Sequence, residues 1–152
     1  MRTQEATWFG AVNICREFSR RAARSLRVVW PEALVTPLSS NAQELVLQAM
    51  SSEVNLIMSR QGQASAAPSP HQHKLRLSLE NSLAWLDARW PEVTATLPSQ
   101  RDLSYLEVAA YCLLTHLDFR ELVQTSRYLT LAEFARRFGE RASVRETAYR
   151  FD

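Results

Sequence analysis

Residues 103–120, LSYLEVAAYCLLTHLDFR, decide the fold that this sequence predicts. Ser104 and Glu107 have the spacing of a capping box, in which the serine caps the amide three residues on and the glutamate side chain reaches back. Leu103 and Val108 flank them at the two positions of a hydrophobic staple, which directs the chain into the helix. The body that follows is the most apolar helical segment of the chain. We therefore expect a buried central helix that begins at Ser104.

Amphipathic helical patterns lie on both sides of this central segment. Apolar residues recur every three or four positions in them, and none of the sequence alternates polar and apolar residues as a half-buried strand does. The expected helices cover residues 9–30, 40–60, 74–90, 104–117 and 130–139, with a short last turn from residue 143. The fold class is therefore all-α, a bundle of about five helices plus a leading amphipathic helix.

Local signals predict where several of these helices begin and end. Two further capping boxes join Ser40 with Gln43 and Thr130 with Glu133. Pro91 should end the third helix at the preceding tryptophan, since the residue before a proline avoids the helical region. Residues 62–73, GQASAAPSPHQH, are small, polar and proline-bearing, so we expect them to form an exposed loop.

Length and composition favour one globular domain with an appendage. The chain has 152 residues, of which 46% are hydrophobic and 22% charged, close to the globular average. No apolar run approaches the roughly 20 residues that span a bilayer, and no secretory signal is seen, so we expect no membrane association and a cytoplasmic location. An arginine-rich start is also typical of mitochondrial transit peptides, but Glu5 and Glu17 weaken that interpretation.

Charge divides the chain into two parts. Residues 1–38 carry six arginines against three glutamates, and we interpret them as a leading amphipathic helix and linker. Residues 39–152 are nearly balanced in charge and form the helical domain. A candidate interaction face lies on the leading helix, where clustered cations would suit a protein partner or, as a lesser alternative, nucleic acid phosphates. Its residues are Arg16, Arg20, Arg24 and Arg27.

The order of these motifs resembles the helical C-terminal domain of glutathione S-transferases. Residues 103–110, LSYLEVAA, resemble the capping box and staple of the family's central helix, and residues 141–144, RASV, resemble the segment after its next helix. Glu107 stands where the family prefers aspartate and Ala142 where it prefers proline. The resemblance covers about residues 39–152 and implies a helical bundle that supplies one wall of a substrate pocket.

The same resemblance implies that the glutathione-binding half is almost absent. Residues 10–16 resemble the last helix of the thioredoxin-like domain, but Gly10 and Ala11 stand where the family binds the γ-glutamyl end. We expect no complete glutathione site and no catalytic residue in this chain. Either it acts without catalysis, or Met1 is an internal start and the catalytic half lies upstream. The in-frame sequence before Met1 would distinguish the two, and glutathione is expected as a cofactor only in the second case.

Two kinds of binding are consistent with such a module. A bundle without its partner domain exposes apolar surface, which suits a protein partner or a homodimer. A small apolar ligand is the other expectation, in a pocket lined by Met50, Val54, Met58 and Tyr105.

Other chemistry finds little support in the residues. His71 and His73 lie in the expected loop without further ligands, and His116 stands alone on the central helix, so we expect no metal site. No G-x-S-x-G elbow occurs, and three glycines make no phosphate loop. Cys15 lies on the apolar face beside an arginine, which leaves a packed thiol as the expectation and a reactive one as the alternative. Cys112 is expected in the core.

Overall fold

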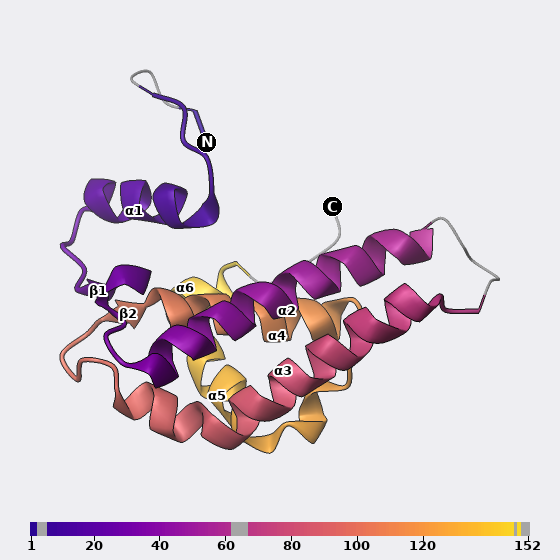
Figure 1. Ribbon diagram of the computed structural model, residues 1–152. Coiled ribbons are helices and arrows are strands. Elements are labelled where there is room, and N and C mark those ends of the chain that lie inside the picture. The colour runs from indigo at the N-terminus through magenta and orange to yellow at the C-terminus, as the bar shows by residue number, and fades with distance from the viewer. Residues whose placement is uncertain (3–5, 62–66, 148, 150–152) are drawn as a thin grey trace.

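A computed structural model describes residues 1–2, 6–61, 67–147 and 149. The described chain is mostly helical, which confirms the all-α class, while the features specific to glutathione S-transferases stay predictions. No helix in the described part is both long and apolar enough to cross a membrane. The elements, in chain order (Figure 1), are α1 (Ala11–Arg21), β1 (Val28–Val29), a 3₁₀ turn (Pro31–Ala33), α2 (Pro37–Gln61), α3 (Pro70–Ala95), β2 (Leu103–Ser104), α4 (Tyr105–Phe119), a 3₁₀ turn (Thr125–Arg127), α5 (Leu129–Gly139) and α6 (Ala142–Arg145).

The two long helices α2 and α3 form an antiparallel hairpin (Figure 1). Small residues on α2, at a spacing of three or four, form part of the buried face of this helix, and none of them is exposed. They are Ala42, Val46 and Ala49. On α3 the same core contains leucines at the predicted helical spacing together with Trp90.

Both long helices extend beyond the predicted limits. α2 begins at Pro37, because the hydroxyl of Thr36 accepts from the N–H of Ser39 at 3.1 Å and a proline suits the first helical position. α3 begins at Pro70 because Ser69 and Gln72 form a complete capping box. The last four residues of the loop expected over residues 62–73 therefore belong to α3. Residues 62–66 lie outside the described part.

Pro91 does not end α3, which continues to Ala95. The proline removes one backbone hydrogen bond near the end of the helix, and Figure 1 shows α3 changing direction toward that end. Trp90 and Val93 are buried on either side of Pro91, so their packing keeps the last turn helical. The prediction failed because tertiary packing offset a local helix-breaking signal.

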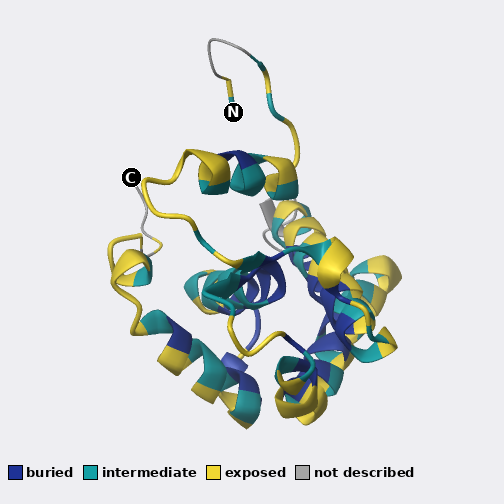
Figure 2. Cartoon of the chain, turned by 90° about the vertical axis from the view of Figure 1, so that its left-hand side faces the viewer, coloured by how far each residue is buried: buried dark blue, intermediate teal, exposed yellow. Residues whose placement is uncertain are grey.

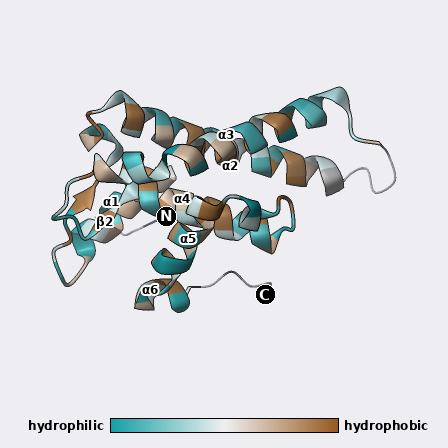
Figure 3. Cartoon of the chain, turned by 90° about the horizontal axis from the view of Figure 1, so that it is seen from below, coloured by the Kyte–Doolittle hydropathy of each residue, from teal (hydrophilic) through white to brown (hydrophobic). Residues whose placement is uncertain are grey.

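The central position of α4 is confirmed by its burial. It packs against α2 on one side and α5 on the other, and α6 lies on the side away from the hairpin (Figure 3). Figure 2 shows the buried residues gathered where these helices face one another. The buried face of α4 is almost entirely aliphatic, and includes Leu106, Leu113, Leu114 and Leu117.

The predicted capping box of α4 is not formed. Ser104 does precede the first helical residue, but its side chain makes no capping hydrogen bond and its buried Oγ has no partner in the described part of the chain. The carboxylate of Glu107 instead accepts from Nε and a terminal nitrogen of Arg101, both at 2.8 Å. The bidentate guanidinium contact is the stronger of the two alternatives for a carboxylate.

The capping box predicted at Thr130 is also absent. α5 begins at Leu129, before Thr130, and Glu133 pairs with an arginine one turn later. The N–H of Leu131 donates to Oδ1 of Asp87 on α3 at 2.9 Å. A carboxylate from another helix therefore takes the place of the local cap.

The leading segment holds a shorter helix than expected. α1 ends at Arg21, and an irregular segment then leads to β1, which pairs in parallel with β2. In Figure 2 α1 lies at the rim of the main helices, and Val12 and Cys15 of α1 pack against the core. The two-residue strands were missed because such a short ladder has no alternating pattern; it pairs Val28 with Leu103 and Val29 with Ser104.

Candidate functional site

An apolar groove runs along the outer side of α4 and is the candidate site. Its other wall is made by the end of α5, by α6 and by the chain that follows. Its volume is about 760 Å³, within the usual size for small-molecule sites. We call it the α4 groove, and it is lined by Leu103, Val108, Tyr111, Cys112, Thr115, Phe119, Phe138, Arg141, Ser143, Val144, Thr147 and Tyr149.

The groove exists because one face of α4 is only half covered. Val108, Tyr111, Cys112, Thr115 and Phe119 follow the helical spacing of three or four, and all five are intermediate in burial. The hydroxyl of Thr115 donates to backbone carbonyls of its own helix, so it presents a methyl group without an unpaired polar atom. α4 therefore offers a continuous, mostly apolar floor.

Aromatic rings lie at both ends of this floor. Near the start of α4, Tyr111 packs against Phe138 with ring centres 5.1 Å apart. Near its end, Tyr149 packs against Phe119 at 5.6 Å and against His116 at 5.2 Å. The rings give the groove rigid apolar walls of the kind that bind flat or elongated apolar molecules.

A buried acid and a histidine lie beneath Tyr149. Nδ1 of His116 is 2.9 Å from Oε1 of Glu53, although that oxygen accepts no well-formed hydrogen bond in the described part of the chain. Nε2 of His116 accepts from Nε of Arg120 at 3.3 Å, so the ring proton of the neutral imidazole must be on Nδ1, facing the carboxyl.

Burial dominates the ionisation of this pair. It raises the pKa of Glu53 to about 7, and the nearby Arg120 offsets only part of that effect. Burial also lowers the pKa of His116, with Arg120 adding to the decrease. Near neutral pH the imidazole is therefore neutral and the carboxyl is partly protonated.

Both cysteines are poor nucleophiles in this structure. Burial raises the pKa of Cys112, which lines the groove, and also that of Cys15, which packs against the core from α1. A thiol with a raised pKa is mostly protonated at neutral pH. The expectation of a packed Cys15 agrees with this burial.

The predicted pocket residues lie elsewhere. Met50, Val54 and Met58 share one face of α2, where Val54 is 52% and Met58 61% exposed. Tyr105 is buried at the start of α4, with its ring 6.4 Å from that of Trp30. None of the four lines the α4 groove, so a pocket made by them stays a prediction.

The predicted arginine face is divided by ion pairs. Arg16 pairs with Glu32, and Arg20 pairs with Glu17 at 3.3 Å. Arg24 and Arg27 lie beyond the end of α1, and both approach Asp102, at 3.8 and 3.4 Å. The correction is that these four side chains do not form one helical face, because α1 ends before the last two.

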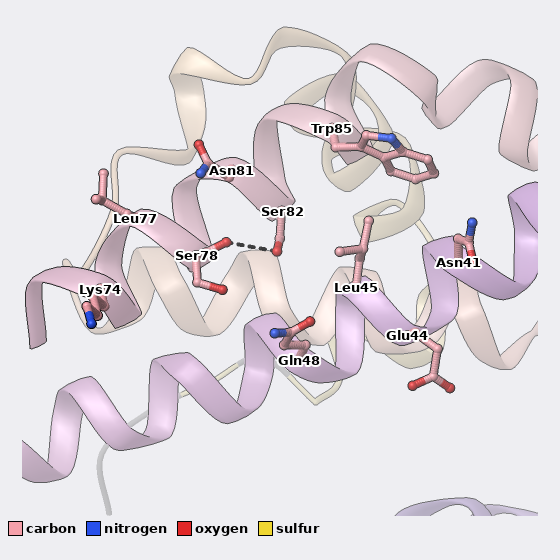
Figure 4. Close-up of a pocket in the computed structure, with 10 residues that line it drawn as sticks. All are labelled: Asn41, Glu44, Leu45, Gln48, Lys74, Leu77, Ser78, Asn81, Ser82 and Trp85. Atoms are coloured by element: carbon pink, nitrogen blue, oxygen red, sulfur yellow. Dashed lines mark hydrogen bonds between the residues drawn. The ribbon is translucent and has the colours of Figure 1, made fainter. Parts of the chain in front are cut away.

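A second cavity, of about 780 Å³, lies on the outside of the α2–α3 hairpin. Figure 4 shows its lining, which comes from both helices and combines Leu45, Leu77 and Trp85 with amide, hydroxyl and charged side chains. Ser82 donates there to the backbone carbonyl of Ser78 at 2.8 Å. Its amide and charged side chains make this cavity more polar than the α4 groove, and so less suited to an apolar ligand.

The histidines are dispersed. His71 and His73 lie exposed in the first turns of α3 rather than in a loop, and His116 is far along the chain on α4. Among the described residues, no three histidine, cysteine or acidic side chains are grouped closely enough to hold a metal ion.

Sequence reasoning missed several residues of the site, above all Glu53 and Arg141. A signal for Glu53 was present, because it falls on the buried face of α2 in register with Val46, Ala49 and Leu56. An acid at such a position has to find a partner or stay protonated. For Arg141 no local signal exists, since its position at the groove depends on how α5 and α6 pack on α4.

Comparison with known proteins gives no match: no family model fits the chain, and neither a curated protein nor a solved structure matches it. The resemblance to the helical domain of glutathione S-transferases therefore stays a prediction that depends on the residues quoted above.

Proposed function

We propose that this chain is a glutathione S-transferase-like helical module that binds a small, largely apolar molecule in the α4 groove. The observation that carries the proposal is the groove itself, about 760 Å³ in volume with aromatic side chains at both ends. Binding is favoured over catalysis because the Cys112 thiol has a raised pKa and Tyr149 covers His116.

A larger side chain on the floor of the groove can block the site without disturbing polar contacts elsewhere. Thr115 lies midway along the floor, and replacing it by phenylalanine adds a ring where the ligand should lie. Replacing it by valine keeps the volume almost unchanged and serves as the matched control. The floor is half-buried, so we expect both variants to fold, which circular dichroism checks.

The test uses the neutral dye N-phenyl-1-naphthylamine, whose fluorescence rises in apolar surroundings. The wild-type chain should bind it saturably at one site, and Thr115→Phe should weaken binding by about tenfold or more, as overpacking of a site does. Thr115→Val should leave the affinity within about threefold. Dye binding that does not saturate, or that Thr115→Phe leaves unchanged, would contradict a ligand site in the groove.

A protein partner or homodimer is the second candidate, favoured by the exposed apolar residues on α2. Val54 and Met58 lie one turn apart on that helix and are both more than half exposed. Sedimentation velocity should then show a dimer that Val54→Glu removes. A monomer at all concentrations would leave only a different protein as the partner of this face.

A catalytic half encoded upstream is the remaining alternative. It is supported only by the resemblance of residues 10–16 to the end of a thioredoxin-like domain. Retention of the present chain on immobilised glutathione would count against the ligand-binding proposal as stated, because the groove has no feature specific for that peptide.

A further inference from the structure

The charge distribution of the α4 groove is one-sided. Among its described lining residues, Arg141 is the only charged side chain, and no carboxylate lines the groove. The guanidinium of Arg141 lies over the ring of Phe138, 4.9 Å from its centre, which holds it at the groove wall. A cation therefore stands at the edge of an otherwise apolar site.

Arg141 also marks one end of the groove. Its two terminal nitrogens both donate to the backbone carbonyl of Asp102 at 3.2 Å, just before the start of α4. Phe119 and Tyr149 mark the opposite end, and α4 between them is 15 residues long. At a rise of about 1.5 Å per residue this helix spans about 20 Å, so the groove is elongated with its charge at one end.

Neighbouring carboxylates do not neutralise Arg141. Asp102 directs its carboxylate to Arg27, Glu107 is held by Arg101, and Glu140, the residue just after α5, pairs with Arg136. Within the described part of the chain, only the carbonyl of Asp102 accepts hydrogen bonds from Arg141. Two of its five N–H groups suffice for that carbonyl, which leaves donors for a further acceptor.

The geometry points to an anionic amphiphile as the ligand of the α4 groove: an elongated apolar body with one carboxylate, which pairs with Arg141. This inference rests on the proposed function and names its ligand class. The aromatic and aliphatic lining would take the apolar body, and the guanidinium would bind the carboxylate through charge-assisted hydrogen bonds. A cationic head group would meet repulsion from Arg141 and no opposing charge.

Two ligands that differ only in the head group test the assignment. Decanoate and 1-decanol, below the concentration at which either aggregates, compete with N-phenyl-1-naphthylamine at pH 8. They are compared on the wild-type chain, on Arg141→Gln, and on Arg145→Gln. Arg145→Gln is the matched control: it also removes one arginine charge, but from a residue of α6 that does not line the groove.

On the wild-type chain and on Arg145→Gln, decanoate should displace the dye at a concentration about tenfold lower than decanol does. The reason is that charge-assisted hydrogen bonds are about twice as strong as neutral ones. Arg141→Gln should abolish that preference while decanol binding stays unchanged. Arg141→Lys, which keeps the charge but not the planar fork, should retain part of it.

Four outcomes separate this inference from the proposed function. Equal displacement by the two ligands from the wild-type chain overturns the anionic assignment and leaves the apolar site standing. A preference for decanoate that persists in Arg141→Gln overturns the role of Arg141. If the dye binds in the groove but neither ligand displaces it, the inferred ligand class is wrong and the apolar site still stands. If the dye does not bind, the proposed function itself fails.

Discussion

Replacing Glu53 by glutamine should make the stability of this protein less dependent on pH. The Glu53 side chain is only 2% exposed, lies 2.9 Å from Nδ1 of His116, and has a pKa raised by burial from 4.5 to about 7. Glutamine has nearly the same shape and cannot ionise, so the variant removes the titration and keeps the packing.

The sign follows from which state binds the proton. Between pH 4.5 and about 7 the folded protein keeps Glu53 protonated while the unfolded chain has lost the proton, so the folded state is favoured less as the pH rises. Below that window both states are protonated, and above it both are ionised. A shift of this size corresponds to about 3 kcal/mol, lost from the wild-type protein as the pH rises through the window.

His116 contributes to the pH dependence of stability in the opposite sense, and it is present in both the wild type and the variant. Its pKa is lowered, so the stability that it contributes is lost as the pH falls below the value of the unfolded chain. Tyr149, whose pKa is raised, stays protonated over the whole range. The difference between wild type and Glu53→Gln therefore reports the titration of the Glu53 carboxyl together with its coupling to His116, 2.9 Å away.

The assay is urea unfolding followed by circular dichroism at intervals from pH 4.5 to 8. Glu53→Gln should gain about 3 kcal/mol over the wild type between the two ends of that range. Glu44→Gln, on the exposed side of the same helix, controls for the loss of a carboxylate. If the pair were instead an ion pair of imidazolium and carboxylate, the wild type would gain on the variant as the pH rises, and the reasoning would be refuted.

Three further predictions concern helix ends and thiol chemistry. Ser69→Ala should cost about 1 kcal/mol of unfolding free energy, because it removes a complete cap, whereas Ser104→Ala should change it by less than about 0.5 kcal/mol, because that hydroxyl caps nothing. Asp87→Ala should lower the free energy of unfolding by about 1 kcal/mol, because it leaves the N–H of Leu131 without its acceptor. Urea unfolding measures all three variants. If Asp87→Ala left the stability unchanged, the cap between helices would be contradicted. The thiol of Cys112 should be alkylated more slowly at pH 8 in the folded than in the urea-unfolded chain, measured by mass spectrometry of its peptide, and equal rates would contradict its burial.

The helices were predictable because their signals are local. Apolar spacing located α2, α3, α4 and α5, since a helix that buries one face must repeat its apolar residues every three or four positions. The central position of α4 followed from the same pattern. The exact ends of the helices were predicted less well. Several serine, glutamine and glutamate side chains that could cap a helix bind other groups instead; Glu107, for example, pairs with Arg101.

The site was much less predictable than the fold. The predicted pocket residues on α2 share a helix face, but whether such a face encloses a cavity depends on what packs opposite to it. The α4 groove needs α6 to come within reach of α4, and Arg141 reaches it only through a carbonyl 39 positions earlier in the chain. A local pattern contains no information about such a pair.

By itself, then, the sequence determined the all-α class, the number and order of the main helices, and which face of each is apolar. Only the tertiary structure decided that Asp102 holds Arg27 across 75 positions, that Asp87 caps a different helix, and that Glu53 faces His116. The physical reason is that helix formation depends on neighbours within about one turn, whereas the partner of a buried charge is chosen by packing between helices. The half-covered face of α4, and the groove that it forms, are likewise decided by packing between helices.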